Sequence, residues 1–502
     1  MLRRCLVSWF VVTSLVLGAS LSAQPQAPGR QQEETARRLF QSGLAFLGQQ
    51  RYGEAVKDFT AVATSFSSTS VADDAWLELA RYQLEVAGDL RQAETAVESI
   101  AKLYPASDSA AMGLVLAGRV MLASGRTPEN VEAALASFDR VPRLYPASPA
   151  IPVSSYYAGE TLRLAKRIPE ALERYRQVTL DYPTSPWSAR ALLGAGQCLT
   201  VTGQSLQALQ QLQRVGSRFP GSAEADRALS WNTILFRLYV RAPSRPAYAF
   251  GDRSFAGPSG KLKDVEAIAA TGDRVLVATR TALVSFDPAG TIKGSTSVHQ
   301  LRSMFLDAAA QPVVTFKTAF QVGAGPLKSV TVPKPDGSGR ELDGIPAGVG
   351  TSRGEMLFVD RDAKAIVRFS AEGKHLGTFA ALNADRLAIN GLDEVAGLMR
   401  DDKTVTIFDR VGAVLAKIPA KAATYELRNP VALAYDALGH LYVLDRGRQG
   451  VHVFSPQAKW LVTFAIDPNA PGAFREPAAL AVDPAGRLYI YDERTESVIL
   501  YR

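Results

Sequence analysis

Hydrophobic positions in the first half of the chain recur with the period of a helix. Between residues 37 and 59, apolar side chains fall at i, i+3, i+4 and i+7 in two consecutive stretches, which places them on one face of each helix. Five such pairs of stretches occupy about residues 33–222, and Ala223–Val240 follows as a closing helix. A single pair cannot bury its apolar face, so the pairs are expected to stack into an α-solenoid over residues 33–240.

One marker closes each predicted helix pair. It is an aromatic residue followed by small residues, with proline after the aromatic in four of the five copies. The markers begin at Phe66, Tyr104, Tyr145, Tyr182 and Phe219, which lie 37 to 41 residues apart. Proline cannot continue a helix, and the Ser, Thr or Asp that follows can cap the next one. We therefore expect the second helix of each pair to end at the aromatic residue, which packs between units.

The repeat resembles the tetratricopeptide repeat, in particular the periplasmic type found in cell-envelope coordination and outer-membrane assembly proteins. The resemblance is carried by Tyr156–Gly159, by the stretch Glu170–Tyr175 and by the Tyr-Pro-x-Ser ends of the units. Such arrays mostly bind peptides or other proteins. The resemblance therefore implies a binding role for the solenoid and no catalytic one.

Beyond residue 262 the apolar period changes to that of a strand. The Pro/Gly/Ser-rich segment 241–262 marks the boundary between the helical half and the strand-rich half of the chain. We expect this segment to act as a linker and to supply one strand to the second half. Short alternating runs separated by Asp-Pro-Ala-Gly-type turns then indicate small antiparallel strands. The clearest copies begin at Pro430 and Pro477, 47 residues apart. A third good copy covers Gly354–Phe369, and the worn copies are Val265–Thr296, Leu301–Val332 and the one around Val405–Phe408.

The copies resemble the NHL type of repeat, and they predict a six-bladed β-propeller over residues 263–502. The last copy stops after its third strand, at Tyr501. We expect Tyr248–Phe255 to supply the missing outer strand, because closing the ring removes open sheet edges. A seventh blade or a partly open sheet is the alternative, since the first two copies are weak.

The first 23 residues have the order of a secretory signal peptide. Arg3 and Arg4 precede an apolar run from Cys5 to Leu17, and a small-residue tail ends at Ala23. We expect cleavage after Ala23, with residues 24–32 as a linker, and a periplasmic or secreted location. An uncleaved anchor is the alternative. No cysteine follows the tail, so a lipid anchor is not expected, and no other segment is apolar enough to span a membrane.

Charge adds little to this organisation. The formal net charge of the chain is +7, but residues 24–249 carry 24 Lys and Arg against 21 Asp and Glu, and residues 250–502 carry 30 against 28. Neither part is basic enough to indicate a nucleic-acid partner. Cys198 is the only cysteine outside the leader, so the mature chain has no internal disulfide and no zinc-type spacing.

No catalytic set can be recognised. Asp360, Asp445 and Asp492 hold one position in three blades, where symmetry sets them apart, so each is expected to cap a local turn and not to act as an acid or base. The four histidines do not fall at metal-ligand spacing. We therefore expect no enzyme activity, no cofactor and no metal site. The four histidines are His299, His375, His440 and His452.

A propeller enzyme of the lyase or lactonase kind, or a small-ligand or polysaccharide-binding sensor, is the alternative, with the repeats as an assembly arm. Such propellers place carboxylates, amides or histidines from several blades at the central mouth. The residues that could do so here are His299, Asp264, Asp343, Asn429 and Glu476.

Basic residues gather just before the innermost strand of several blades. In such propellers these loops face one rim of the central channel, which could take an anionic peptide, glycan or lipid headgroup. The alternative is a set of scattered solvated charges, partly neutralised by Asp264 and Glu476. The candidate rim site consists of Lys263, Arg302, Arg386, Arg428 and Arg475, with Asn429 and Glu476 beside them. Together these features predict an exported scaffold, in which solenoid and propeller each bind a protein or peptide partner in the cell envelope.

Overall fold

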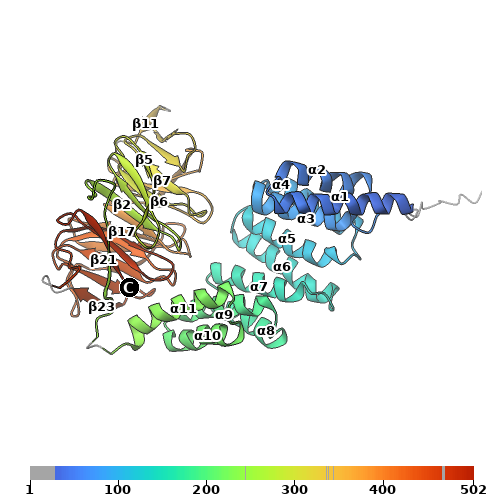
Figure 1. The fold of residues 1–502 in the computed structure, drawn as a ribbon, viewed down its shortest axis with the longest axis horizontal. Coiled ribbons are helices and arrows are strands. Elements are labelled where there is room, and N and C mark those ends of the chain that lie inside the picture. The colour runs from blue at the N-terminus through green and yellow to red at the C-terminus, as the bar shows by residue number, and fades with distance from the viewer. Residues whose placement is uncertain (1–28, 243–244, 335, 337, 343, 466–469) are drawn as a thin grey trace, which may run out of the picture. The chain divides into compact units, whose positions relative to one another are not determined.

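The computed structural model describes residues 29–242, 245–334, 336, 338–342, 344–465 and 470–502 (Figure 1). The predicted signal peptide, most of the linker 24–32 and Asp343 lie outside these residues. The chain divides into two compact units, residues 1–120 and residues 121–502.

Helix pairs make up the described part of the first unit. The helix α1 packs on α2, and α3 packs on α4. A Cβ atom added to Gly43 of α1 would lie 2.6 Å from the ring of Phe59 in α2, so a residue without a side chain lets these two helices approach closely. The helices are α1 (Arg30–Gly48), α2 (Tyr52–Ser65), α3 (Ala72–Tyr82) with the π-helical turn η1 (Gln83–Ala87), α4 (Leu90–Leu103) and the start of α5 (Ser109–Ala123).

The second unit begins with the remaining helices. Here α7 packs on α8 and α9 on α10, and α11 with its π-helical extension ends the series, so the described helices have the number and order that were predicted. These helices are α6 (Pro128–Leu144), α7 (Ile151–Leu164), α8 (Ile168–Asp181), α9 (Pro186–Val201), α10 (Ser205–Arg218), α11 (Ala223–Leu235) and η2 (Phe236–Val240).

The aromatic markers end the helices as predicted. Helices α2, α4, α6, α8 and α10 each stop one residue before a marker aromatic, and all five of these aromatic side chains are half-buried. The hydroxyl oxygens of Ser185 and Ser222 accept hydrogen bonds from the backbone N–H groups of Trp187 and Ala225, so they cap α9 and α11.

Six four-stranded antiparallel sheets follow, which confirms the six-bladed propeller. A separate two-stranded hairpin, β10 (Thr331–Pro333) and β11 (Gly339–Glu341), follows the last strand of blade 2 in the chain. Blade 1 holds β2 (Val265–Ala270), β3 (Val275–Thr279), β4 (Ala282–Phe286) and β5 (Ile292–Ser297). Blade 2 holds β6 (Ser303–Leu306), β7 (Pro312–Thr315), β8 (Ala319–Val322) and β9 (Lys328–Ser329). Blade 3 holds β12 (Gly348–Gly350), β13 (Met356–Asp360), β14 (Ala365–Phe369) and β15 (His375–Ala380).

The remaining blades include the one that closes the ring. Strand β1 (Phe250–Phe255) pairs with β26, with Ser254 opposite Ile499, so the segment before the propeller completes blade 6 as predicted. Blade 4 holds β16 (Arg386–Ile389), β17 (Val395–Met399), β18 (Thr404–Phe408) and β19 (Val414–Ile418). Blade 5 holds β20 (Pro430–Tyr435), β21 (Leu441–Asp445), β22 (Gly450–Phe454) and β23 (Trp460–Ala465). Blade 6 holds β24 (Pro477–Val482), β25 (Leu488–Asp492) and β26 (Ser497–Tyr501) with β1.

The helices and the propeller of the second unit share an apolar core. One cluster of buried side chains joins Leu235 of α11 with Tyr248, Tyr442 and Tyr501. The Tyr248 and Tyr442 hydroxyls lie 2.8 Å apart, within hydrogen-bonding distance. The Tyr239 hydroxyl lies 3.0 Å from Nε2 of the fully buried His440. Part of the segment between helices and strands is therefore built into this core.

Polar contacts between helices and propeller fall on one end of the channel. They use the turns that follow the inner strands β12, β16, β20 and β24 and two turns between outer strands, which hold Arg410 and Gln457; this end of the ring is here called the turn face. Arg126 donates to Ser352 Oγ at 2.9 Å, the Lys166 ammonium lies 2.7 Å from Glu394, and Arg237 donates to the carbonyl of Gly486. The basic loops precede the same strands and so lie at the opposite end, here called the rim face.

Candidate functional site

The predicted basic residues lie at the rim face, where the inner strands begin. Lys263, Arg428 and Arg475 each precede the first residue of their strand by two positions, and Arg302 precedes β6 by one. These four side chains are exposed. Arg386 instead is the first residue of β16, half-buried, and lines the channel itself. The blades therefore bring the five basic residues to one end of the ring. Four of them are exposed in the loops, and Arg386 lies deeper, in the channel lining.

Buried aspartates hold the rim loops in place. Asp445 accepts hydrogen bonds from the backbone N–H groups of Arg428 and Asn429 at 2.7 and 2.8 Å. Asp492 accepts from the backbone N–H groups of Arg475 and Glu476 in the same way. The third aspartate of this set, at position 360, accepts from a backbone N–H in the turn that follows it. These bonds agree with the predicted capping role of the three aspartates.

Substitution of Asp445 by alanine is expected to lower the free energy of unfolding by roughly 2–4 kcal/mol, because the N–H groups of Arg428, Asn429 and Gly447 lose their acceptor. Burial opposes ionisation of Asp445, but the nearby His452 imidazole and hydrogen bonds from the backbone keep its pKa below the usual value. Its stabilisation is thus present above the unfolded-state pKa and lost as pH falls through the folded-state pKa.

Urea unfolding at neutral and acidic pH measures this effect. Asp402→Ala, which removes an exposed carboxylate from a turn of blade 4, serves as the control. An Asp445→Ala protein as stable as the control at neutral pH would contradict the capping role.

Acidic residues at the rim neutralise part of its positive charge. Glu426 lies 3.1 Å from Arg428 and 2.8 Å from Arg448. Glu476 lies 3.1 Å from Arg446. Asn429 is exposed beside Arg428. The rim therefore presents alternating charges and not a single positive field, which favours a ligand that carries hydrogen-bonding groups as well as negative charge.

The central channel is lined mainly by apolar residues. Its lining comes from the inner strands of all six blades and encloses a cavity of about 240 Å³. Of the lining residues that the structure describes, Glu266 and Arg386 alone carry charge. Glu266 forms an ion pair with Arg280 at 2.6 Å. Burial, followed by the nearby charge of Arg400, lowers the pKa of Arg386.

The histidines do not gather at this channel. His440 is hydrogen-bonded to Asp436 under the turn face, at 2.8 Å from its Nδ1. His452 lies within β22 and faces Asp445 at 3.6 Å. His375 begins β15, where burial lowers its pKa, and His299 follows β5. Of the other residues considered for the channel mouth, Asp264 is exposed.

Aromatic residues gather on the first helices of the fourth and fifth pairs, α7 and α9, which pack alongside each other. The rings of Tyr156 and Tyr157 lie 5.2 and 5.6 Å from the ring of Trp187. The Arg190 guanidinium stacks on Trp187 at 4.5 Å and pairs with Glu224 at 3.2 Å. These four residues, with Trp187 half-buried and Arg190 exposed, are named the aromatic patch.

A buried tyrosine packs beneath the aromatic patch, with its ring 6.2 Å from that of Tyr156. The ring of Tyr175 in α8 fills the space left by Gly159 and Gly194, where an added Cβ would lie 2.7 and 2.5 Å from it. Its hydroxyl donates to Glu160, which also pairs with Arg163 at 2.8 Å. Pre-positioned aromatic and arginine side chains are the groups that dominate binding energy in protein interfaces.

The helices match two known families. Residues 32–192 match the YfiO family, described as an outer membrane lipoprotein. Residues 190–222 match a tetratricopeptide repeat family. The N-terminal region is thus a solenoid of the tetratricopeptide type, as its repeats indicated, and the C-terminal region is a six-bladed propeller. No curated protein matches the chain.

Solved structures resemble each half separately. Virginiamycin B lyase from Staphylococcus aureus is 12% identical, with a TM-score of 0.34, over 48% of this chain and 81% of the lyase. A gluconolactonase from Xanthomonas campestris is 14% identical, with a TM-score of 0.35, over 52% and 98%. The MamA protein is 15% identical, with a TM-score of 0.29, over 37% and 92%. Likeness at this level carries no argument about activity.

Among the described residues, no helix has the length and apolar character needed to cross a membrane.

Sequence reasoning did not identify two residues of the site, Glu266 and Trp187. Glu266 sits inside an alternating strand, where its position in the channel depends on the sheet register. Trp187 is the second residue of α9, directly after Pro186 and five residues after the marker aromatic Tyr182. A large aromatic residue so close to a repeat boundary could have been used as a signal for a binding residue.

Proposed function

We propose that the protein is an exported, non-catalytic scaffold of the bacterial cell envelope that binds partner proteins. The observation that carries this proposal is the channel lining, which consists mainly of apolar residues and supplies one carboxylate and one guanidinium where a propeller enzyme would need several converging polar groups. The signal-peptide pattern and the match of residues 32–192 to an outer membrane lipoprotein family support the location.

The aromatic patch is the proposed partner site on the solenoid. Trp187 and the two tyrosines offer a large contact area at low conformational cost, and Arg190 adds a planar donor beside it. Arrays of tetratricopeptide type mostly bind peptides or proteins, and the patch fits a peptide segment with apolar and acidic side chains.

The rim face is the proposed partner site on the propeller. The turn face contacts helices of the same unit, so the basic loops at the other end are the surface left for a partner. Lys263, Arg302, Arg428 and Arg475 are exposed there, with Asn429 and Glu476 between them and Arg386 at the channel mouth. An anionic peptide, glycan or lipid headgroup would satisfy these groups.

Replacing Trp187 and Arg190 together by alanine is expected to reduce recovery of the solenoid's partner by about tenfold or more, because interface anchors of this type contribute 2 kcal/mol or more. The measurement is crosslinking capture from the native envelope with the full-length protein, followed by mass spectrometry. The Arg176→Ala protein is the control, since Arg176 is an exposed arginine in α8 that pairs with Glu173 at 2.8 Å.

A charge-reversed rim, Arg428→Glu with Arg475→Glu, should lose a different set of partners in the same capture. Recovery of no partner by the wild-type protein, or equal recovery by all variants, would overturn the scaffold proposal.

A small-ligand sensor or propeller enzyme is the second candidate, and the charged pair Glu266 and Arg386 in the apolar cavity is the observation that favours it. The same preparations distinguish the two. Native mass spectrometry that finds a small molecule on the wild-type protein, lost in Arg386→Ala, together with no captured protein, would replace the scaffold proposal by this one.

A further inference from the structure

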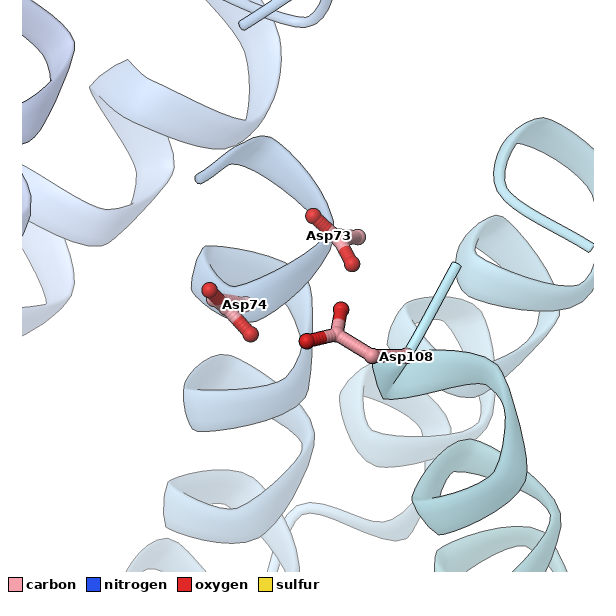
Figure 2. Close-up of side chains that lie close together, drawn as sticks. All are labelled: Asp73, Asp74 and Asp108. Carbon is pink, nitrogen blue, oxygen red and sulfur yellow. The ribbon is translucent and has the colours of Figure 1, made fainter. Parts of the chain in front are cut away.

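Three carboxylates from two successive helix pairs converge in the first unit. Asp73 and Asp74 lie in the first turn of α3, and Asp108 immediately precedes α5. Figure 2 shows the three carboxylate groups directed toward one another. One oxygen atom from each can be chosen so that all three lie within 4.8 Å of one another. Sequence reasoning did not find this group, because its members are 34 and 35 residues apart.

Asp73 is the second observation that points to a ligand. The residue is only 5% exposed, and no hydrogen bond or ion pair to its carboxylate is found among the described residues, although its oxygens are not completely enclosed. Asp74 accepts one hydrogen bond, from the Ser109 hydroxyl at 2.7 Å. A buried carboxylate without a donor or a positive charge is strongly unfavourable, so proteins pair such groups or use them to bind a metal ion.

The helix start explains only part of this group. Acidic residues also occur in the first turns of α1 and α11, where they interact favourably with the helix dipole, whereas α5, α7 and α9 have none there. Asp108 occupies the position directly before α5, where an aspartate can cap a helix, and its carboxylate also lies beside those of Asp73 and Asp74.

We propose that Asp73, Asp74 and Asp108 bind a divalent cation, and that this cation is Ca²⁺. The donor set is all oxygen and anionic, which selects hard cations over zinc or copper. Ca²⁺ binds oxygens at about 2.3–2.6 Å, so oxygens on one ion are at most about 5 Å apart, which the carboxylate spacing meets. Asp108 is exposed, and water can complete the larger coordination shell of Ca²⁺ from that side.

Such an ion would link two neighbouring repeats. It would join the start of α3 to the start of α5 and so fix the stacking of the second and third helix pairs. It would also supply the positive charge that Asp73 lacks. This inference is independent of the partner sites proposed above.

Terbium luminescence with the full-length protein tests the site directly. Tb³⁺ takes the place of Ca²⁺, and its emission is excited directly or through an aromatic side chain such as Tyr104, which precedes Asp108 by four residues. We expect saturable emission that Ca²⁺ displaces, with Mg²⁺ needed at higher concentration. Asp108→Asn should weaken binding by about tenfold or more. The Asp401→Asn, Asp402→Asn protein, altered at two adjacent exposed carboxylates, should bind as the wild type does.

Thermal unfolding gives a second and distinct readout. Ca²⁺ should raise the Tm of the wild type above its value in EDTA, and Asp108→Asn should abolish this rise. In EDTA the same variant should be at least as stable as the wild type, because one repelling charge is gone. Absence of a Ca²⁺-dependent Tm in the wild type, or Tb³⁺ binding unchanged by Asp108→Asn, would overturn the proposal. A preference for Mg²⁺ over Ca²⁺ would overturn the choice of ion.

Discussion

Replacement of Tyr248 by alanine is expected to lower the free energy of unfolding of residues 121–502 by about 3–5 kcal/mol. Tyr248 is 2% exposed, and its ring lies 5.2 Å from the ring of Phe464 and 5.0 Å from the guanidinium of Arg237. Its removal would leave a cavity where the helices meet blade 5, and it would take a hydrogen-bond partner from Tyr442. Guanidinium unfolding followed by circular dichroism measures the change.

Tyr248→Phe separates the ring from the hydroxyl. This variant keeps the packing, and the Tyr442 hydroxyl retains its bond to Asp436, so a loss of only about 1 kcal/mol is expected. Two variants of equal stability would contradict the view that the aromatic ring holds helices and propeller together.

Gly412→Ala is the second large effect, with an expected loss of about 3–5 kcal/mol. Gly412 lies in the turn between β18 and β19 with φ of +96°, which L-residues rarely adopt. An added Cβ would lie 1.9 Å from the carbonyl oxygen of Phe379 in the neighbouring blade 3. Backbone strain and collision therefore act together, and blades 3 and 4 must separate to admit the methyl group.

Gly377→Ala is the matched control, measured by the same thermal and denaturant unfolding. Gly377 also has positive φ, +122°, but a Cβ there meets nothing within 4 Å. It should cost only the backbone strain, roughly 1–2 kcal/mol. Equal losses at Gly377 and Gly412 would show that strain alone, without contact between blades, accounts for the effect.

Local patterns were enough to predict both repeat architectures. The proline after Tyr104, Tyr145 and Tyr182 cannot continue a helix, so the helix ends depend on a few adjacent residues. Blade closure was also predictable, because the copy that ends at Tyr501 lacks a fourth strand and only the segment before blade 1 could supply it.

Contacts between distant residues account for what the sequence could not predict. Asp73 and Asp108 are brought together by the stacking of two helix pairs, which no spacing within one pair reveals. His440 pairs with Tyr239 across some two hundred residues, so the coverage of the turn face was equally hidden. Arg386 was assigned to the basic rim, but the register of the short strand β16 places it within the channel lining.

The pairing of β1 with β26 also determines when the propeller can be completed. Its two partners, residues 250–255 and residues 497–501, are separated by nearly all of the propeller sequence. Pairings between such distant segments form late, whereas neighbouring helices make their contacts as soon as they are synthesised. For a chain that emerges N-terminus first, we therefore expect a period in which the helices are folded and the unfinished ring exposes two unpaired sheet edges. In that period α11 and its extension offer blades 5 and 6 a preformed apolar surface, so the solenoid would also assist the folding of the propeller that follows it.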